Sequence, residues 1–490
     1  MKKMKKLNKF IYYILLVFIA SFINTGCQDV DVENFNDPDL ETTLKSSDDY
    51  PDILSGAYLS WWDATHKYSP YMTLSVAGNH GSSSWGNFNM REVGTVSDPY
   101  GLGNHKPLNN TQSAPSTAYL EVPFYDLYSA ISTANDVLKG INTDGNLVNN
   151  SQITTDNTAF QAYVIRGLSY GYLALLYDQG FVITEETDLL TVKGEALVTS
   201  PNILAQAISD LDKALSISTT VDVDISQFNG LNMPKAMAVR LVNSYAAKFL
   251  ALHPRSVEES NSLDWGKVKT YAENGITETF APLGDGGTNW WHAYNLHSNS
   301  GWIRVDQQII NMIDSNQPYP FPDSGTYTVD FSTIPDNRLG ETDSGAYFEF
   351  AGAPPFRANR GIYFYSFFKF NKYSDYPSDF TLPMPSMTAA ENDLLIAESI
   401  VRTSGDLTTA TDLINKTRVT IGGLNPATIS DTDLLEKILY ERYLEAYEGP
   451  GNPFFDRRRT GTLGQKQFTQ FPLPALELNT LGLPLYTFGG

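Results

Sequence analysis

The sequence predicts a mainly α protein, built from stacked helical hairpins of the tetratricopeptide type with long irregular loop excursions and few short strands. Three observations predict this fold class. Apolar residues recur at steps of three and four over most long segments, which is the period of an amphipathic helix. Small residues lie inside some of these segments, where a second helix can approach closely. Gly, Pro, Asn and Ser gather in long blocks between groups of helices, and no strict 34-residue repeat is visible.

Five helices are predicted in the first half of the chain. Gly167 and Gly171 lie within the third, and they favour close packing against a neighbouring helix at a cost in helix propensity. Ser200 and Pro201 suit the N-cap and the first turn of the fourth, and Pro254 ends the fifth. The predicted ranges are 48–61, 119–138, 156–177, 200–215 and 234–252.

Four more helices are predicted in the second half, at 264–274, 389–402, 406–418 and 431–447. Gly275 suits the position after the first of these. The blocks between the helix groups are 62–117, 278–388 and 450–490, and their best strand candidate is 363–370. Long excursions from a rigid scaffold are where binding sites usually lie, so we expect the functional site there.

The composition limits the classes of partner. The chain has 490 residues and a formal net charge of −21, with 42% apolar and 12% aromatic residues that can fill a large core. Such an acidic surface repels nucleic acid and anionic lipid headgroups. The sequence contains one cysteine, so an internal disulfide is excluded and packing must stabilise the fold.

That cysteine, Cys27, follows a lysine-rich start at 1–9 and a short apolar run at 10–23. This layout is typical of a secretory signal peptide, and a cysteine at its end suits a bacterial lipoprotein signal. We therefore predict a signal peptide at 1–26, lipidation of Cys27 as a membrane anchor, an acidic tether at 27–40 and one helical domain at 41–490. A plain signal peptide with an incidental cysteine is the alternative.

Several segments share a spacing of charged and small residues with one known family. The first runs from Glu391 to Arg418 through Glu398, Arg402 and Asn415, and a second contains Glu441-Arg442, Glu445 and Glu448-Gly449. Others are Asp456 to Arg459, Phe471-Pro472-Leu473-Pro474 with Glu477, and the helix at 156–177 followed by Asp178-Gln179-Gly180. Together with the lipoprotein start, these segments resemble the SusD/RagB family of outer-membrane nutrient-binding lipoproteins. The terminal Phe488-Gly489-Gly490 departs from that pattern.

The resemblance implies a lipoprotein on the surface of a Bacteroidetes outer membrane. It implies four helical hairpins as a scaffold and a ligand face built from loops. Such a protein acts as a lid on a TonB-dependent (SusC-like) transporter and captures glycans, or peptides in some members. It has no catalytic activity.

Aromatic residues are the best candidates for contact with a glycan. A sugar ring has an apolar face that stacks on indole or phenol rings, and a rim of hydroxyls that hydrogen-bonds to amides and charged groups. Two loop clusters meet this requirement, one at 78–88 and one at 289–304, and we expect one of the adjacent Trp290 and Trp291 to be buried and the other exposed. The candidate ligand-binding residues are Asn79, Trp85, Asn87, Trp290, Trp291, Tyr294, Trp302 and Arg304.

The carboxylates of the last helix allow an enzymatic alternative. Glu441, Glu445 and Glu448 share a helix face, as an acid/base pair of an α-helical glycoside hydrolase would. We instead expect them to form ion pairs with Arg442 and Arg457–Arg459. The six histidines form no metal-binding motif or tight cluster and no phosphate-binding loop is present, so we predict no catalytic residue, metal or cofactor.

Overall fold

The structure, a computed structural model, describes residues 46–83, 85–86, 90–94, 105–113, 117–319, 328–352 and 365–490. From Ser47 to Gly490 the described residues group into one compact unit. The predicted signal peptide, Cys27, the tether and Asn87 lie outside the described residues. The predicted start of the domain at residue 41 therefore stays a prediction.

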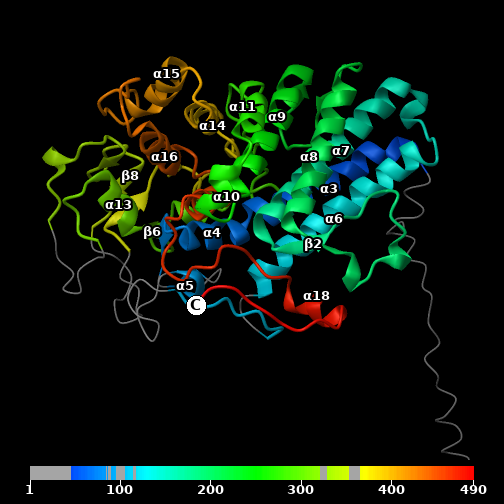
Figure 1. The fold of residues 1–490 in the computed structure, drawn as a ribbon, viewed down its shortest axis with the longest axis horizontal. Coiled ribbons are helices and arrows are strands. Elements are labelled where there is room, and N and C mark those ends of the chain that lie inside the picture. Colours follow the sequence, from blue (N-terminus) through cyan, green and yellow to red (C-terminus); the bar gives the residue numbers. More distant parts are fainter. Residues whose placement is uncertain are drawn as a thin grey trace, which may run out of the picture. The chain divides into compact units, whose positions relative to one another are not determined.

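Consecutive helices pack in pairs, and each pair packs on the next (Figure 1). This arrangement confirms the predicted fold class of stacked helical hairpins. α16 (Leu434–Glu445) packs on the last pair and closes the stack. The four pairs are α3 (Tyr50–His66) with α6 (Thr117–Asn142), α7 (Gln152–Leu176) with α8 (Ser200–Ser218), α9 (Lys235–Leu252) with α11 (Trp265–Glu273), and α14 (Ala389–Arg402) with α15 (Leu407–Arg418).

The glycines of α7 set the closeness of its packing. A Cβ atom added at Gly171 would lie on the ring of Phe249 from α9, at 2.1 Å from its nearest atom. One added at Gly167 would lie 2.8 Å from the side chain of Leu211 in α8. The prediction that these small residues permit close helix crossings is therefore confirmed.

Side-chain caps fix where several helices begin. The hydroxyl of Thr388 accepts a hydrogen bond from the backbone N–H of Glu391 at 3.0 Å and starts α14. Asp406 starts α15 in the same way through Thr408. These caps satisfy N–H groups that have no partner within the helix, so the predicted and observed starts agree closely.

Two helices lie where the sequence predicted irregular excursions. α4 (Tyr68–Ala77) is buried along its described side chains, so it lacks the polar face that would mark an amphipathic period. α17 (Asn452–Arg459) contains Pro453 and four consecutive charged residues, yet it is entirely buried. Both were missed because their burial does not follow from their pattern.

Short elements fill the excursions. The helices are α5 (Met90–Val93), α10 (Val257–Ser262), α12 (Tyr294–His297), α13 (Gln307–Ile313) and α18 (Ala475–Thr480), with single 3₁₀ turns at Ser47–Asp49, Val148–Asn150, Leu189–Thr191, Gly194–Ala196 and Phe331–Thr333. The antiparallel ribbons are β1 (Gly81–Ser82) with β6 (Arg304–Val305), β2 (Gln179–Phe181) with β3 (Leu197–Thr199), and β4 (Asp224–Ile225) with β5 (Met233–Pro234). β8 (Phe348–Phe350) pairs with β7 (Leu339–Gly340) and with β9 (Phe368–Phe370). The strand predicted at 363–370 is therefore shorter in the structure, since residues 365–367 are described but lie outside β9.

Glu441 and Glu445 of α16, and Glu448 just after the helix ends, are buried in ion pairs. The guanidinium nitrogens of Arg338 lie 2.7 Å from a carboxylate oxygen of Glu441, 3.0 Å from one of Glu445 and 2.7 Å from one of Asp336. Glu448 pairs with Lys372 at 2.6 Å. The predicted arginine partners were wrong for these three glutamates, since their cations come from the excursion between α11 and α14.

A second buried network joins α14, α16 and α17. Asp456 pairs with Arg442 and with Arg459, and Arg459 also reaches Glu398 at 2.6 Å. Arg458 donates to the carbonyl oxygens of Leu175 and Leu252. These carboxylates, like Glu441, Glu445 and Glu448, are almost fully buried, so they hold the scaffold together away from solvent.

None of the helices in the described residues is both long and apolar enough to cross a membrane.

Candidate functional site

The β1–β6 ribbon brings together two tryptophans that lie far apart in the sequence. Gly81 pairs with Val305 and Ser82 with Arg304, so Trp85 and Trp302 follow and precede paired residues at the same end of the ribbon. The Ser83 hydroxyl donates to the carbonyl oxygen of Trp302 at 2.7 Å and accepts from the backbone N–H of Trp85 at 3.1 Å. One serine therefore joins the two loops that carry the indoles.

The two indoles differ in exposure. Trp85 is 43% exposed, and Trp302 is half-buried. The loop at 298–302, which leads into Trp302, exposes Asn299 and Gly301 to solvent. A hydrogen bond from the Trp302 N–H to the Asn299 carbonyl oxygen, at 2.9 Å, closes the turn of this loop. We name Trp85 and Trp302 the ribbon tryptophans, since together they offer an accessible indole on a fixed backbone.

Arg304 supports this site from beneath. Its guanidinium is buried and donates to the carbonyl oxygens of Ser300 at 3.0 Å and Phe367 at 3.1 Å. Burial lowers the pKa of Arg304 to about 10. The structure thus places Arg304 as a positioning residue for the 298–302 loop, whereas the sequence predicted a surface contact.

Two other predicted site residues lie in the interior. Asn79 is buried and has a φ of 52°, where it ends the turn after α4. Tyr294 is fully buried, its ring stacks on His292 at 3.6 Å, and its hydroxyl donates to the carbonyl of Pro385. These placements correct the expectation that both present side chains at the surface. The surrounding aromatic core, invisible in the sequence pattern, encloses them.

The adjacent tryptophans have different environments. Trp290 is buried against Trp62, with ring centroids 5.2 Å apart. Trp291 is half-buried, and its carbonyl accepts from the indole N–H of Trp62 at 2.9 Å. The Nζ atom of Lys67 lies 5.8 Å from the centroid of the Trp291 ring. Trp290 therefore belongs to the core, and Trp291 is the member of the pair with an accessible surface.

Lys67, which lies over the Trp291 ring, interacts with carboxylates from two helices that the sequence did not identify. Lys67 forms an ion pair with Asp63 one turn earlier in α3. Asp126 of α6 has its pKa raised to about 6 by burial and by the negative charge of Asp63. The i, i+4 spacing of Asp63 and Lys67 could have predicted their ion pair from the sequence. The interaction of Asp126 with them could not be predicted, because it depends on the packing of α6 against α3.

Four of the six histidines lie in one continuous series of ring contacts in the interior. The ring centroids of His66 and His292 are 5.3 Å apart, and those of His297 and His80 are 6.3 Å apart. The ring of Tyr71 connects these two pairs, because it contacts both His292 and His297. Burial lowers the pKa of each of the four. They act as neutral core rings beneath the excursions.

Comparison with known proteins identifies the fold. No family model and no curated protein sequence matches this chain. A SusD superfamily protein from Bacteroides vulgatus has a similar solved structure, with a TM-score of 0.58 and 17% identity over 90% of this chain and 98% of that one. One from Parabacteroides distasonis has a TM-score of 0.61 and 16% identity, over 88% and 97%. The chain has the SusD superfamily fold.

A further solved structure with this SusD-like fold is described as a SusD-like carbohydrate binding protein from Bacteroides vulgatus. It has a TM-score of 0.53 and 17% identity, covering 87% of this chain and 85% of that one. At these identities the likeness concerns the fold.

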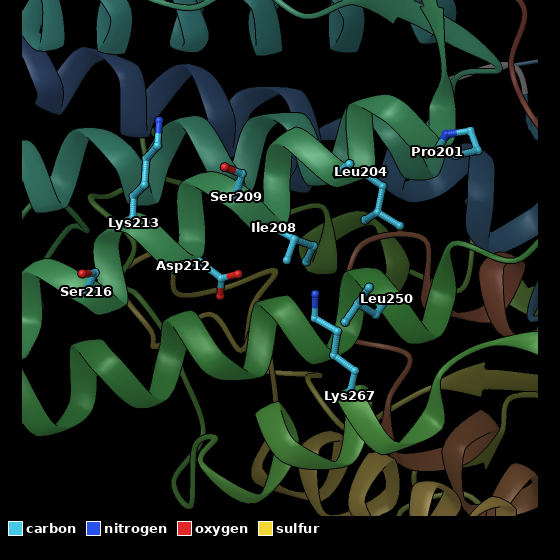
Figure 2. Close-up of a pocket in the computed structure, with 10 residues that line it drawn as sticks. Pro201, Leu204, Ile208, Ser209, Asp212, Lys213, Ser216, Leu250 and Lys267 are labelled. Carbon is cyan, nitrogen blue, oxygen red and sulfur yellow. The ribbon is translucent and has the colours of Figure 1, made fainter.

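The scaffold of this SusD-like fold also has a groove of about 640 Å³ between α8, α9 and α11 (Figure 2). Leu204, Ile208 and Leu250 form its apolar part. Asp212 and Lys267 lie at its edge, where Asp212 accepts a hydrogen bond from Tyr271 at 2.6 Å. Its ten lining residues include no aromatic ring, so it lacks a surface on which a sugar could stack.

Proposed function

We propose that this protein binds an oligosaccharide without chemical conversion, with the ribbon tryptophans as its stacking surface. The observation that carries this proposal is the pairing of β1 with β6, which holds Trp85 and Trp302 on one side of a rigid ribbon. An accessible indole beside exposed amide and backbone groups matches the apolar face and hydroxyl rim of a sugar. A carbohydrate-binding protein among the similar solved structures supports the same class of ligand.

Trp291 offers a second contact for the same kind of ligand. Lys67 places a cationic group beside that ring that can hydrogen-bond sugar hydroxyls, and Asp63 pairs with it. We include Trp291 as a secondary site because its exposed surface is smaller than that of Trp85. Asn87, outside the described residues, stays a predicted ligand contact.

Replacing Trp85 by alanine should weaken oligosaccharide binding at least tenfold, because it removes the stacking surface and its apolar contact, worth about 1.4 kcal/mol or more. Trp302→Ala should have a similar or smaller effect. A glycan array should first select the ligand, and calorimetry then gives the dissociation constants. Met237→Ala, which removes an exposed apolar side chain of α9, is the matched control and should leave affinity unchanged.

Unchanged affinity in Trp85→Ala would rule out the ribbon tryptophans as the site. Binding of oligopeptides in place of oligosaccharides would show that this fold captures peptides. New reducing ends after incubation with the selected glycan would show hydrolysis and contradict a binding role.

We further propose that the protein is a lipoprotein of the outer membrane that passes its ligand to a TonB-dependent, SusC-like transporter. The resemblance of the C-terminal segments to the SusD/RagB family and the lipoprotein-like start at 1–27 support this proposal. The acidic tether at 27–40 would then separate the anchor from the helical domain.

Cys27→Ser should release the protein from the membrane fraction, because the thiol that accepts the lipid is lost while the rest of the sequence is kept. Fractionation and metabolic labelling with palmitate measure the change, with the unmodified chain as reference. Labelling and membrane retention that persist in the variant would contradict lipidation at this residue.

A further inference from the structure

A groove of about 990 Å³ runs beside α6 on the first hairpin. Its other walls are the loop between β2 and β3 at 181–192 and the helix α18. We name it the α6 groove. Its lining residues run from Phe124 to Lys139 on α6 and include Thr143 just after the helix ends, a span of roughly 28 Å at the rise of a helix.

The floor of the α6 groove is apolar and fixed. Phe124, Tyr128 and Ile131 come from α6, and Phe181, the last residue of β2, also lines the groove. The Tyr128 hydroxyl donates to the carbonyl of Phe181 at 2.9 Å and accepts from its N–H at 2.6 Å. These reciprocal hydrogen bonds hold the loop at a set distance from α6, so the groove is preformed.

Two leucines at the edge of the groove point into solvent. Leu189 is 65% exposed and Leu190 is 91% exposed. They lie on a 3₁₀ turn that Asp188 caps through the N–H of Leu190 at 3.1 Å, and Val192 closes the turn through the carbonyl of Leu189. A structured turn that presents adjacent leucines to water is typical of a surface that a partner covers.

The rim of the groove is acidic. Asp136, Glu186, Asp188 and Glu477 line it, against the single cation Lys139. Glu185 also lines the groove, but Arg166 neutralises it through a buried ion pair. A partner that covers the apolar floor must therefore bring positive charge to this rim.

We propose that the α6 groove binds a basic amphipathic helix of a partner protein. Apolar residues on one face of that helix would contact the floor and the two exposed leucines, while its lysines and arginines would pair with the acidic rim. A helix of about five turns matches the length of the groove along α6. This inference is independent of sugar binding, because none of the ribbon tryptophans lines the groove.

A fluorescent 18-residue peptide of leucine and lysine, with helical spacing of its leucines, tests the proposal on the full-length protein by fluorescence anisotropy. We expect saturable binding at 0.15 M salt. The double variant Leu189→Ser/Leu190→Ser should weaken it at least tenfold, and so should Glu186→Lys. Both changes lie at exposed positions, and circular dichroism would verify that the variants fold.

Matched controls separate this site from the general attraction of an acidic protein for a basic peptide. Leu147→Ser/Ile153→Ser removes two exposed apolar side chains at the start of α7, and Glu278→Lys changes an exposed charge after α11. Neither should alter the affinity. Hydrogen exchange should slow at 181–192 when the peptide binds.

Equal losses in the groove and control variants would overturn the proposal, as would equal binding by a peptide of leucine and glutamate. Protection that maps elsewhere, or no saturable binding of the leucine–lysine peptide, would overturn it as well.

Discussion

Replacing Arg338 by methionine should destabilise the folded protein by about 3–5 kcal/mol or prevent folding, which would be the largest effect of any substitution considered for this chain. The guanidinium is fully buried and contacts Asp336, Glu441 and Glu445 at once. Without it, closely spaced carboxylates remain in the interior with too little positive charge, and burying unpaired charge is far costlier than burying a neutral side chain. Urea denaturation measures the change in free energy of unfolding.

Two further variants make this prediction specific. Lys416→Met removes an exposed ion pair with Asp393 and should cost less than about 1 kcal/mol. Adding Glu441→Gln to Arg338→Met should recover part of the lost stability, because it removes one of the uncompensated charges. A loss below about 1 kcal/mol in Arg338→Met would contradict the assigned role of the network.

Acidification should destabilise the protein strongly between pH 6.5 and pH 4, because five of the six histidines are buried, His253 is half-buried, and burial lowers the pKa of all six rings. Burial lowers the pKa of His253 and His297 to about 3 and that of His105 to about 4, and it lowers the pKa of the other three as well. Below pH 6.5 the unfolded chain binds protons that the folded rings do not. Each histidine that stays neutral in the folded state then costs about 1.4 kcal/mol per pH unit, so His105, His253 and His297 together cost on the order of 6 kcal/mol at pH 5, and the other three add to this loss.

Buried carboxyls oppose part of this loss. Burial raises the pKa of Asp306 to about 8 and that of Asp126 to about 6, so the folded state binds protons at these groups before the unfolded state does. Their contribution increases stability as the pH falls toward about 4. Since burial lowers the pKa of all six histidines, we expect the net change to be a loss of stability.

His253→Gln isolates one titrating ring. Its imidazole contacts Ser200 at 3.2 Å, a hydrogen bond that the glutamine amide can replace. The variant should lower the pH dependence of the unfolding free energy by about 1.4 kcal/mol per pH unit between pH 6 and pH 4. Measurement at pH 8, where the ring is neutral in both states, gives the packing cost as the internal reference. An unchanged slope would show that His253 does not resist protonation.

The scaffold could be predicted from the sequence because its signals are local. The apolar periodicity of α7, α14 and α15, the glycines of α7 and the caps of α14 and α15 each involve residues only a few positions apart. These helices begin and end close to the predicted limits. α4 and α17 could not be predicted, since their burial results from packing against segments distant in the sequence. The partners of Glu441 and Glu445 were missed for the same reason, because Arg338 lies about a hundred residues earlier.

The candidate site was predictable in its residue types but not in its geometry. Loop composition pointed to Trp85 and Trp302, yet only the pairing of β1 with β6 brings them to one end of a ribbon. Tyr294 has the same local composition around it and lies in the core, because exposure depends on which side of a loop the scaffold covers. The interaction of Asp126 with Asp63 and Lys67 could not be predicted either, because it depends on the packing of α6 against α3.

The hydrogen bond from Ser83 to the carbonyl of Trp302 makes two distant stretches of chain one mechanical unit. Both stretches lie outside the four helix pairs of the stack, since β1 follows α4 and β6 precedes α13. If the ribbon tryptophans bind a sugar as proposed, substitutions in these two stretches can change which saccharide is preferred while the helical framework stays the same.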